Sequence, residues 1–153
     1  MLPKVELHVH LDCCLSYAAV RSLQPSITEA RYRDEFIAPR RCTNLADFLT
    51  RAPKGFGLMQ DEASLRLVTA DLFQQFRDDN VIYGEIRFAP LLHLAGGLSP
   101  EVVVEIVNDA VSIQARDTGI EARVILCTLR HFSATQSLQT AELVQRFRGT
   151  RVV

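Results

Sequence analysis

Apolar residues follow a helical period in several stretches of the chain and a strand-like pattern in others. The longest helical stretch begins at Asp61 and keeps its apolar positions 65, 68, 72, 73 and 76 on one side as far as Asn80. The same reasoning predicts further helices over residues 15–23, 26–36, 45–49, 99–118 and 137–147. Runs rich in Val, Ile and Leu predict strands over residues 3–12, 81–88 and 121–129, and the start of a fourth at 151–153.

Capping residues and helix breakers mark where these elements begin and end. Ser26, followed by Glu29, and Asn44 are expected to cap helices at their N-termini, and Ser99-Pro100-Glu101 combines a cap, a first-turn proline and an acidic first turn. Gly119 is expected to end that helix. Strands that alternate with helices in this way predict an α/β fold with a parallel sheet and helical crossovers.

The first strand places its polar and apolar side chains on opposite faces. Because side chains alternate along a strand, one face is expected to carry Glu6, His8, His10 and Asp12 and the other Val5, Leu7, Val9 and Leu11. The aliphatic face is expected to pack against helices. Two imidazoles separated by one residue can reach one metal ion, although two histidines on a half-exposed antiparallel strand would show the same spacing.

Three stretches, in the same order, resemble the adenosine deaminase family. They are Lys-Val-Glu-Leu-His-Val-His-Leu-Asp at 4–12, Val-Ile-Tyr-Gly-Glu-Ile-Arg-Phe-Ala-Pro at 81–90 and Ile-Leu-Cys-Thr-Leu-Arg-His at 125–131. The resemblance implies a metal-dependent hydrolase on a (β/α)8 barrel and covers about the first half of the family's length. Residues 1–153 are therefore expected to be the N-terminal portion of one barrel domain, a partial barrel with three strands and the start of a fourth. A missing C-terminal half or a second chain would complete it.

The resemblance also implies roles for individual residues. His8 and His10 correspond to zinc ligands, and Asp12, with His10 beside it, to the group that holds the ribose hydroxyl of a purine nucleoside. The family's other ligands and its proton-shuttling glutamate, in a His-Ala-Gly-Glu motif, have no counterpart in this sequence. No catalytic residue is therefore assigned within the chain, and the chain alone is expected to be inert. Side chains that could supply a third ligand instead are Cys13, Cys14, His93 and His131.

Other positions have two interpretations. Residues 45–49 correspond to an apolar lid over the base, or form an ordinary helix packed on the core. His93 and His131 are expected to be solvated loop histidines, Cys127 a small core residue, and Glu85 and Arg87 inward-facing charges that need partners. Cys13-Cys14 replaces the glycine that usually follows the aspartate in adenosine deaminases, so the shape of the sugar site is open.

Composition narrows the class of protein further. With 17 basic and 18 acidic residues, a net charge of −1 and 48% hydrophobic residues, the chain is expected to form a globular unit without affinity for nucleic acid or membranes. The absence of a signal-like segment and of C-x-x-C spacing among four cysteines predicts a cytoplasmic protein with free thiols.

The predicted function is the zinc-dependent deamination of adenosine to inosine. Three alternatives are a deaminase of adenine or a modified adenosine, another metallohydrolase of the same superfamily, and a non-catalytic half-barrel that binds or dimerises through its open edges.

Overall fold

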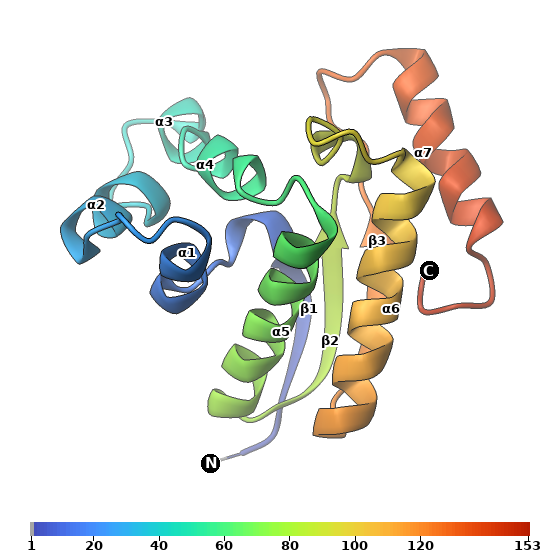
Figure 1. Cartoon of the computed structure of the whole chain (residues 1–153), viewed down its shortest axis with the longest axis horizontal. Coiled ribbons are helices and arrows are strands. Elements are labelled where there is room, and N and C mark those ends of the chain that lie inside the picture. The colour runs from blue at the N-terminus through green and yellow to red at the C-terminus, as the bar shows by residue number, and fades with distance from the viewer. Residues whose placement is uncertain (1) are drawn as a thin grey trace.

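A parallel three-stranded sheet organises the chain, and the computed structural model describes it over residues 2–153 (Figure 1). Strands β1 (Lys4–His10), β2 (Val81–Phe88) and β3 (Glu121–Leu126) lie side by side in sequence order. The β2–β3 register is regular, whereas the β1–β2 register shifts between Lys4 and Val5 and between Glu6 and Val9. Val152 forms a parallel bridge with Val124, where the sequence predicts a fourth strand.

Helices fill the connections between these strands. Helices α5 (Glu62–Asp78) and α6 (Pro100–Thr118) are the long crossovers and pack together against one face of the sheet (Figure 1). Helix α7 (Ala134–Arg146) follows β3. Four short helices lie beyond the C-terminal end of β1: α1 (Tyr17–Leu23), α2 (Glu29–Phe36), α3 (Leu45–Leu49) and α4 (Ala52–Gly57). Single 3₁₀ turns, η1 (Leu11–Cys13) and η2 (Pro90–Leu92), follow β1 and β2.

Most helix ends lie where the capping signals predict them. The side chain of Asp61 accepts a hydrogen bond from the Ser64 amide, and Asn44 and Ser99 cap α3 and α6 in the same way. Gly119 ends α6 with a φ of 74°, a conformation in which a side chain would be strained. The cap of α2 is Thr28 rather than the predicted Ser26, since the Thr28 hydroxyl accepts from the Arg31 amide.

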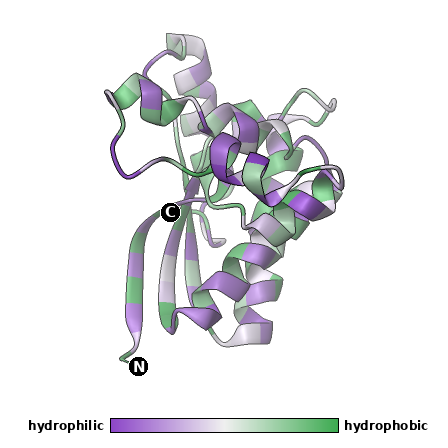
Figure 2. Cartoon of the chain, turned by 90° about the vertical axis from the view of Figure 1, so that its left-hand side faces the viewer, coloured by the Kyte–Doolittle hydropathy of each residue, from purple (hydrophilic) through white to green (hydrophobic). Residues whose placement is uncertain are grey.

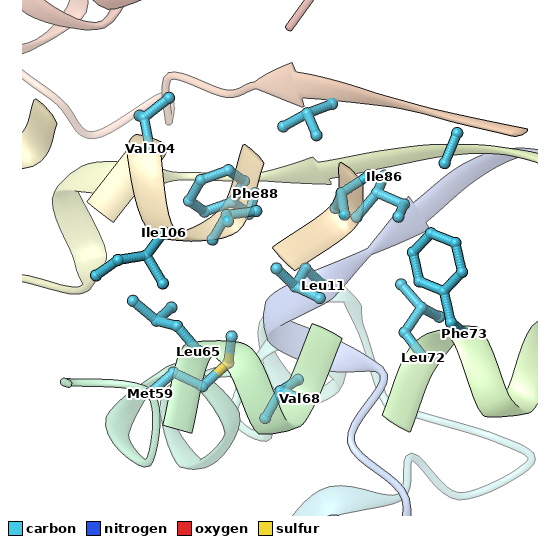
Figure 3. Packing of buried hydrophobic residues seen from close by; sticks show 14 of the residues in the cluster. Leu11, Met59, Leu65, Val68, Leu72, Phe73, Ile86, Phe88, Val104 and Ile106 are labelled. Carbon is cyan, nitrogen blue, oxygen red and sulfur yellow. The ribbon is translucent and has the colours of Figure 1, made fainter. Parts of the chain in front are cut away.

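The hydrophobic core lies between the sheet and helices α5 and α6. Ile86 and Phe88 of β2 point into this layer and are completely buried, as are Leu65, Val68 and Phe73 of α5 and Val104 of α6 (Figure 3). Gly84 lets α5 approach β2 closely, because a Cβ atom there would lie 2.7 Å from the Phe76 ring. Leu11, just beyond β1, is also fully buried and joins the site loop to this core.

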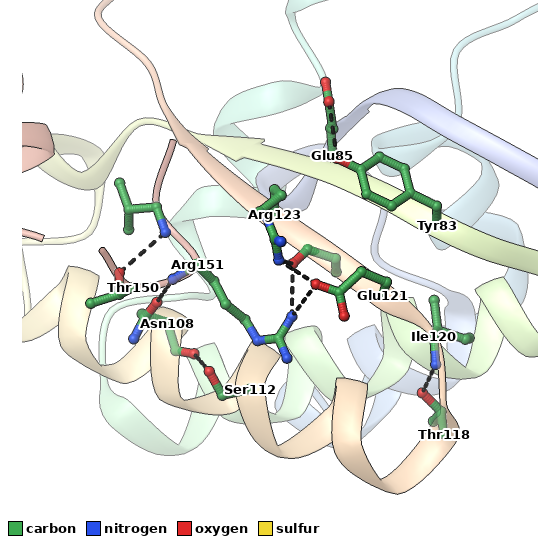
Figure 4. Close-up of polar contacts among 12 residues, drawn as sticks. Tyr83, Glu85, Asn108, Ser112, Thr118, Ile120, Glu121, Arg123, Thr150 and Arg151 are labelled. Atoms are coloured by element: carbon green, nitrogen blue, oxygen red, sulfur yellow. Dashed lines mark hydrogen bonds and ion pairs between the residues drawn. The ribbon is translucent and has the colours of Figure 1, made fainter. Parts of the chain in front are cut away.

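The opposite face of the sheet carries charged side chains. On this face the Tyr83 hydroxyl donates to Glu85 at 3.2 Å, and Glu121 pairs with Arg123 and, at 3.1 Å, with Arg151 (Figure 4). Figure 2 shows the lower part of the strands with helices on one side only. The polar residues at alternate positions of β2 and β3 thus face away from the helical layer.

The aliphatic face of β1 is buried only toward its C-terminal end. Val9 packs against the core, whereas Val5 and Leu7 are 57% and 54% exposed. The prediction of one fully packed aliphatic face is therefore wrong. Val5 is in register with Tyr83 of the charged face, whereas Val9 is in register with Ile86, which points into the core, and the register shift between Glu6 and Val9 breaks the alternation. None of the helices within residues 2–153 is both long and apolar enough to cross a membrane.

Candidate metal and substrate site

The two histidines of β1 point to the same side of the strand and nearly touch. Their Nε2 atoms lie 3.3 Å apart, and the ring centroids are 5.3 Å apart with the planes tilted by 41°. A shared face is what a period of two predicts for positions 8 and 10. The backbone amide of His8 donates to Glu6 at 2.9 Å.

The spacing of these nitrogens fits one tetrahedral metal ion. Two imidazole nitrogens bound at about 2.0–2.1 Å with a tetrahedral angle between them are about 3.3–3.4 Å apart, and the distance from His8 Nε2 to His10 Nε2 is 3.3 Å. Two donors do not complete a site. Among residues 2–153 no three His, Cys, Asp or Glu side chains come together as a metal-binding group, so Cys13, Cys14, His93 and His131 are not placed as a third ligand.

The surroundings of His10 favour its neutral form, which is the form that binds metals. Burial lowers the pKa of His10, and the nearby His8 and Arg87 act in the same direction, whereas the negative charge of Asp12 opposes them. His10 Nδ1 lies 3.9 Å from Asp12 Oδ1. This contact joins the histidine pair to the aspartate that follows the strand.

Asp12 lies within η1, almost completely buried at 5% exposure. Helix α4 packs directly on this turn: a Cβ atom on Gly55 would lie 2.2 Å from the Asp12 carbonyl oxygen. Gly55 has no positive φ, so the close approach rather than the backbone conformation requires glycine here.

A cavity of about 240 Å³ opens beside Asp12 and Cys13. Its other walls come from the loop before α1, from α2, α3 and α4, and from the connections between these three helices: Leu15, Phe36, Ile37, Ala38, Phe48, Leu49, Arg51, Ala52 and Gly55. No described residue of α3 is buried, and Phe48 and Leu49 are half exposed while lining this cavity. Helix α3 is therefore not an ordinary helix packed on the core, which favours the interpretation as a lid.

The Cys13 side chain lies at the cavity where the adenosine deaminase pattern has glycine. Partial loss of hydration, together with the charge and hydrogen bonding of Asp12, raises the pKa of the Cys13 thiol to about 12. Burial, followed by the charges of Asp71 and Asp12, also raises the pKa of Cys14. Both thiols are therefore protonated at neutral pH and are poor metal ligands or nucleophiles.

The expectation that His93 is a solvated loop residue is wrong. His93 is completely buried, its ring lies 5.8 Å from that of Phe88, and its Nδ1 lies 2.9 Å from the Met59 carbonyl oxygen. Because a carbonyl oxygen can only accept, Nδ1 carries the hydrogen. Its Nε2 is buried without a hydrogen-bond partner among the described residues. Burial lowers the pKa of His93, against the opposing effects of the Met59 bond and Asp12.

Other predicted positions divide between confirmation and correction. His131 is exposed, as expected, and its ring packs against Phe132. Cys127 lies just past β3 and is only partly buried, so it is not the core residue that the sequence suggested. Arg87 forms no ion pair within residues 2–153: it donates to the Leu7 carbonyl at 3.3 Å, and its Nε is buried without a partner there.

Comparison with known proteins identifies relatives of the whole chain. The adenosine deaminase family profile matches residues 3–153. The adenosine deaminase of Enterococcus faecalis is 32% identical over 158 residues, covering 99% of this chain and 47% of the relative, and that of Clostridium perfringens is 33% identical with 99% and 48% coverage. The chain spans about half the length of these relatives.

Solved structures share the fold. An N6-mAMP deaminase from Arabidopsis has a TM-score of 0.78 at 21% identity, covering 99% of this chain and 48% of its own. An adenine deaminase from Arthrobacter aurescens has a TM-score of 0.78 at 23% identity, and the match covers 98% of this chain and 46% of that protein. An amidohydrolase from Burkholderia ambifaria with bound Zn has a TM-score of 0.82 at 21% identity, and the match covers 99% of this chain and 43% of that protein. The predicted α/β fold, a partial (β/α)8 barrel, is confirmed.

Proposed function

Because the chain belongs to the adenosine deaminase family, we propose that residues 1–153 form the N-terminal portion of a zinc-dependent purine deaminase barrel that converts adenosine to inosine. The observation that carries the proposal is the 3.3 Å separation of His8 Nε2 and His10 Nε2 beside the buried carboxylate of Asp12. A lone pair of histidines would be weak support. The cavity beside Asp12, which neither histidine lines, supports a substrate site next to the pair.

The chain's own residues would divide the work between metal and substrate. His8 and His10 would hold zinc through Nε2, and zinc, when bound, lowers the pKa of a water molecule toward neutrality. The Asp12 carboxylate would accept a hydrogen bond from a sugar hydroxyl at the end of the cavity. The apolar side chains of Phe48 and Leu49 would cover the purine and exclude water.

The proton transfer in this reaction needs a group that the described residues do not supply. Protonation of the purine ring, which lets ammonia leave, requires a carboxylic acid close to the base, and the only carboxyl group in the cavity lining is Asp12. We assign Asp12 to the sugar. Residues 1–153 on their own are therefore proposed to bind without catalysing deamination.

A related purine is the second candidate substrate, because Cys13 adds a side chain to the cavity beside Asp12. A side chain there changes the shape of the sugar site: a narrower site would favour adenine, which has no sugar, and a reshaped one a modified adenosine. A non-catalytic half-barrel is supported by a different observation, the exposure of Val5 and Leu7 on the outer edge of β1.

A chimera tests the main proposal. Residues 1–153 would be joined to the part of the Enterococcus faecalis adenosine deaminase that lies beyond its match to this chain, and ammonia release would be measured with adenosine, adenine and N6-methyl-AMP. Activity with adenosine that falls at least about a hundredfold in His8→Ala but not in His131→Ala would support the proposal. Preference for another purine would select the second candidate. If the chimera does not fold, zinc binding by residues 1–153 and its loss in His8→Ala take its place.

A further inference from the structure

The loop that carries Asp12 contains few hydrogen bonds of its own. Residues 11–16 connect β1 to α1 through a single 3₁₀ turn of three residues, and no side chain caps that turn. Within the loop, the Cys14 thiol donates to the Leu11 carbonyl at 3.3 Å, a weak interaction. The orientation of Asp12 must therefore be fixed by groups outside the loop.

Two helices supply those groups and bind consecutive backbone positions. Gln75 of α5 donates its side-chain amide to the Cys14 carbonyl at 2.8 Å. Tyr32 of α2 donates its hydroxyl to the Leu15 carbonyl at 2.9 Å. The Ser16 amide donates to Asp71 of α5 at 3.0 Å. Three successive residues at the end of the loop are thus hydrogen-bonded to side chains that do not line the cavity.

The carboxylate of Asp71 is the centre of this arrangement. One oxygen accepts from the Ser16 amide and, at 2.9 Å, from Gln75, while the other accepts from the Ser16 hydroxyl at 2.6 Å. The Ser16 hydroxyl also accepts from the Ala19 amide and so caps α1. A bond between a charged acceptor and a backbone donor is about twice as strong as a neutral one. Asp71 therefore ties α5, the start of α1 and the loop together.

We infer that Asp71 is a positioning residue for Asp12: through Ser16 and Gln75 it holds residues 11–16 so that Asp12 faces the cavity. Asp71 itself does not line the cavity. The functional meaning of this inference rests on the proposed role of Asp12 in binding the substrate. The mechanical part, that Asp71 fixes the loop, can be tested without turnover.

The thiol of Cys13 reports where Asp12 lies. Asp12 raises the pKa of Cys13, whereas Asp71 is not among the groups that shift it. In Asp71→Asn, the loosened loop is expected to move Asp12 away from the thiol and to expose the thiol to water. Alkylation of Cys13 by iodoacetamide is followed by peptide mass spectrometry as a function of pH. The profile is expected to shift by at least about one pH unit to lower pH. Asp78→Asn, an exposed position on the same helix bonded to Gln74, is the matched control and should leave the profile unchanged.

A second variant keeps the carboxylate. Because Asp71 also raises the pKa of Cys14 directly, labelling of Cys14 is measured in Gln75→Ala. This variant removes the bonds from Gln75 to the Cys14 carbonyl and to Asp71 but leaves the Asp71 carboxylate in place. Labelling at least about threefold faster than in the wild-type chain, and independent of urea well below the unfolding transition, indicates local opening of the loop.

An unchanged Cys13 profile in Asp71→Asn would overturn the inference. So would Cys14 labelling in Gln75→Ala that increases only with the urea dependence of global unfolding measured by circular dichroism. If Asp71→Asn does not fold, Ser16→Ala, which retains the backbone bond to Asp71, replaces it in the Cys13 measurement with the same expected direction. Failure of the chimera to deaminate adenosine would remove the proposed function and leave these thiol measurements intact.

Discussion

His8 Nε2 and His10 Nε2 lie 3.3 Å apart on one face of β1, and no third His, Cys, Asp or Glu within residues 2–153 joins them as a metal-binding group. Two imidazoles bind zinc far more weakly than a set of three or four ligands. The pair is therefore expected to give residues 1–153 only a partial metal site, whose affinity for zinc can be measured directly.

The first prediction concerns that affinity. Residues 1–153 are expected to bind one zinc ion with micromolar or weaker affinity and to release no ammonia from adenosine. His8→Ala and His10→Ala should each remove zinc binding, because a single imidazole remains. Isothermal titration with zinc measures both effects, and His131→Ala, an exposed histidine outside the pair, is the control. Equal zinc binding in all three variants would contradict the assignment of the ligands.

The second prediction concerns the contact between α4 and the Asp12 loop. Gly55→Ala places a methyl group 2.2 Å from the Asp12 carbonyl, so α4 or the loop must move. The free energy of unfolding is expected to fall by about 1–3 kcal/mol, measured by urea denaturation. Gly57→Ala, two residues along the same helix with nothing within 4 Å of the new Cβ, should be neutral or slightly stabilising. A similar loss in both variants would contradict the role of the close approach.

The third prediction concerns pH. The pKa of His93 in the folded chain lies below its ordinary value of 6.5, so the unfolded chain binds more protons as the pH falls. The free energy of unfolding should therefore have its full value above about pH 6.5. It should decrease by roughly 1 kcal/mol as the pH falls to 5.5. His93→Asn retains a donor for the Met59 carbonyl and cannot titrate. Urea denaturation between pH 5.5 and 7.5 should show a flatter profile for this variant. If the free energy of unfolding depends on pH in the same way in both proteins, groups other than His93 cause that dependence.

The fourth prediction concerns Cys13. Asp12→Asn removes the charge and leaves the desolvation that raises the pKa of the thiol to about 12. The pKa should therefore fall but stay above the ordinary value of 9.0, and alkylation of Cys13 at pH 9 should accelerate severalfold. Labelling of Cys42 in the same sample is the internal control. No acceleration would mean that Asp12 does not act on this thiol.

The fifth prediction concerns the outer edge of β1. Val5→Thr and Leu7→Thr replace side chains that are more than half exposed, so the free energy of unfolding should change by less than about 0.5 kcal/mol while binding of a hydrophobic dye decreases. Val9→Thr, which contacts the core, should cost about 1 kcal/mol or more. Unchanged dye binding in the two outer variants would place the exposed apolar surface elsewhere.

The sequence predicts the elements well and the surroundings of individual side chains less well. Period and capping locate α5, α6 and β2 within a residue or two, since these signals depend on neighbours along the chain. The same local rules cannot show that His93 is buried, because its partner Met59 lies 34 residues away. The close packing of Gly55 on Asp12 also depends on tertiary structure and has no local signal.

In the candidate site, too, the sequence predicts the local geometry but not the contacts made between distant parts of the chain. A period of two predicts that His8 and His10 share a face, and the 3.3 Å separation agrees with it. The roles of His8, His10 and Asp12 stay predictions, because they depend on the family resemblance rather than on a bound ligand. Asp71 could not have been selected from sequence, since only the packing of α5 on the loop brings it to Ser16.

The pairing of β1 with β2 has a consequence for synthesis on the ribosome. Lys4 is in register with Val81, 77 positions later in the chain. At roughly 5–20 residues per second, the strand with both histidines emerges roughly 4 to 15 seconds before its neighbour exists. During that interval the nascent segment has neither a hydrogen-bonding partner nor a hydrophobic layer. The histidine pair is therefore made before the strand that pairs with it, and β1 cannot complete its hydrogen bonds until β2 has been translated.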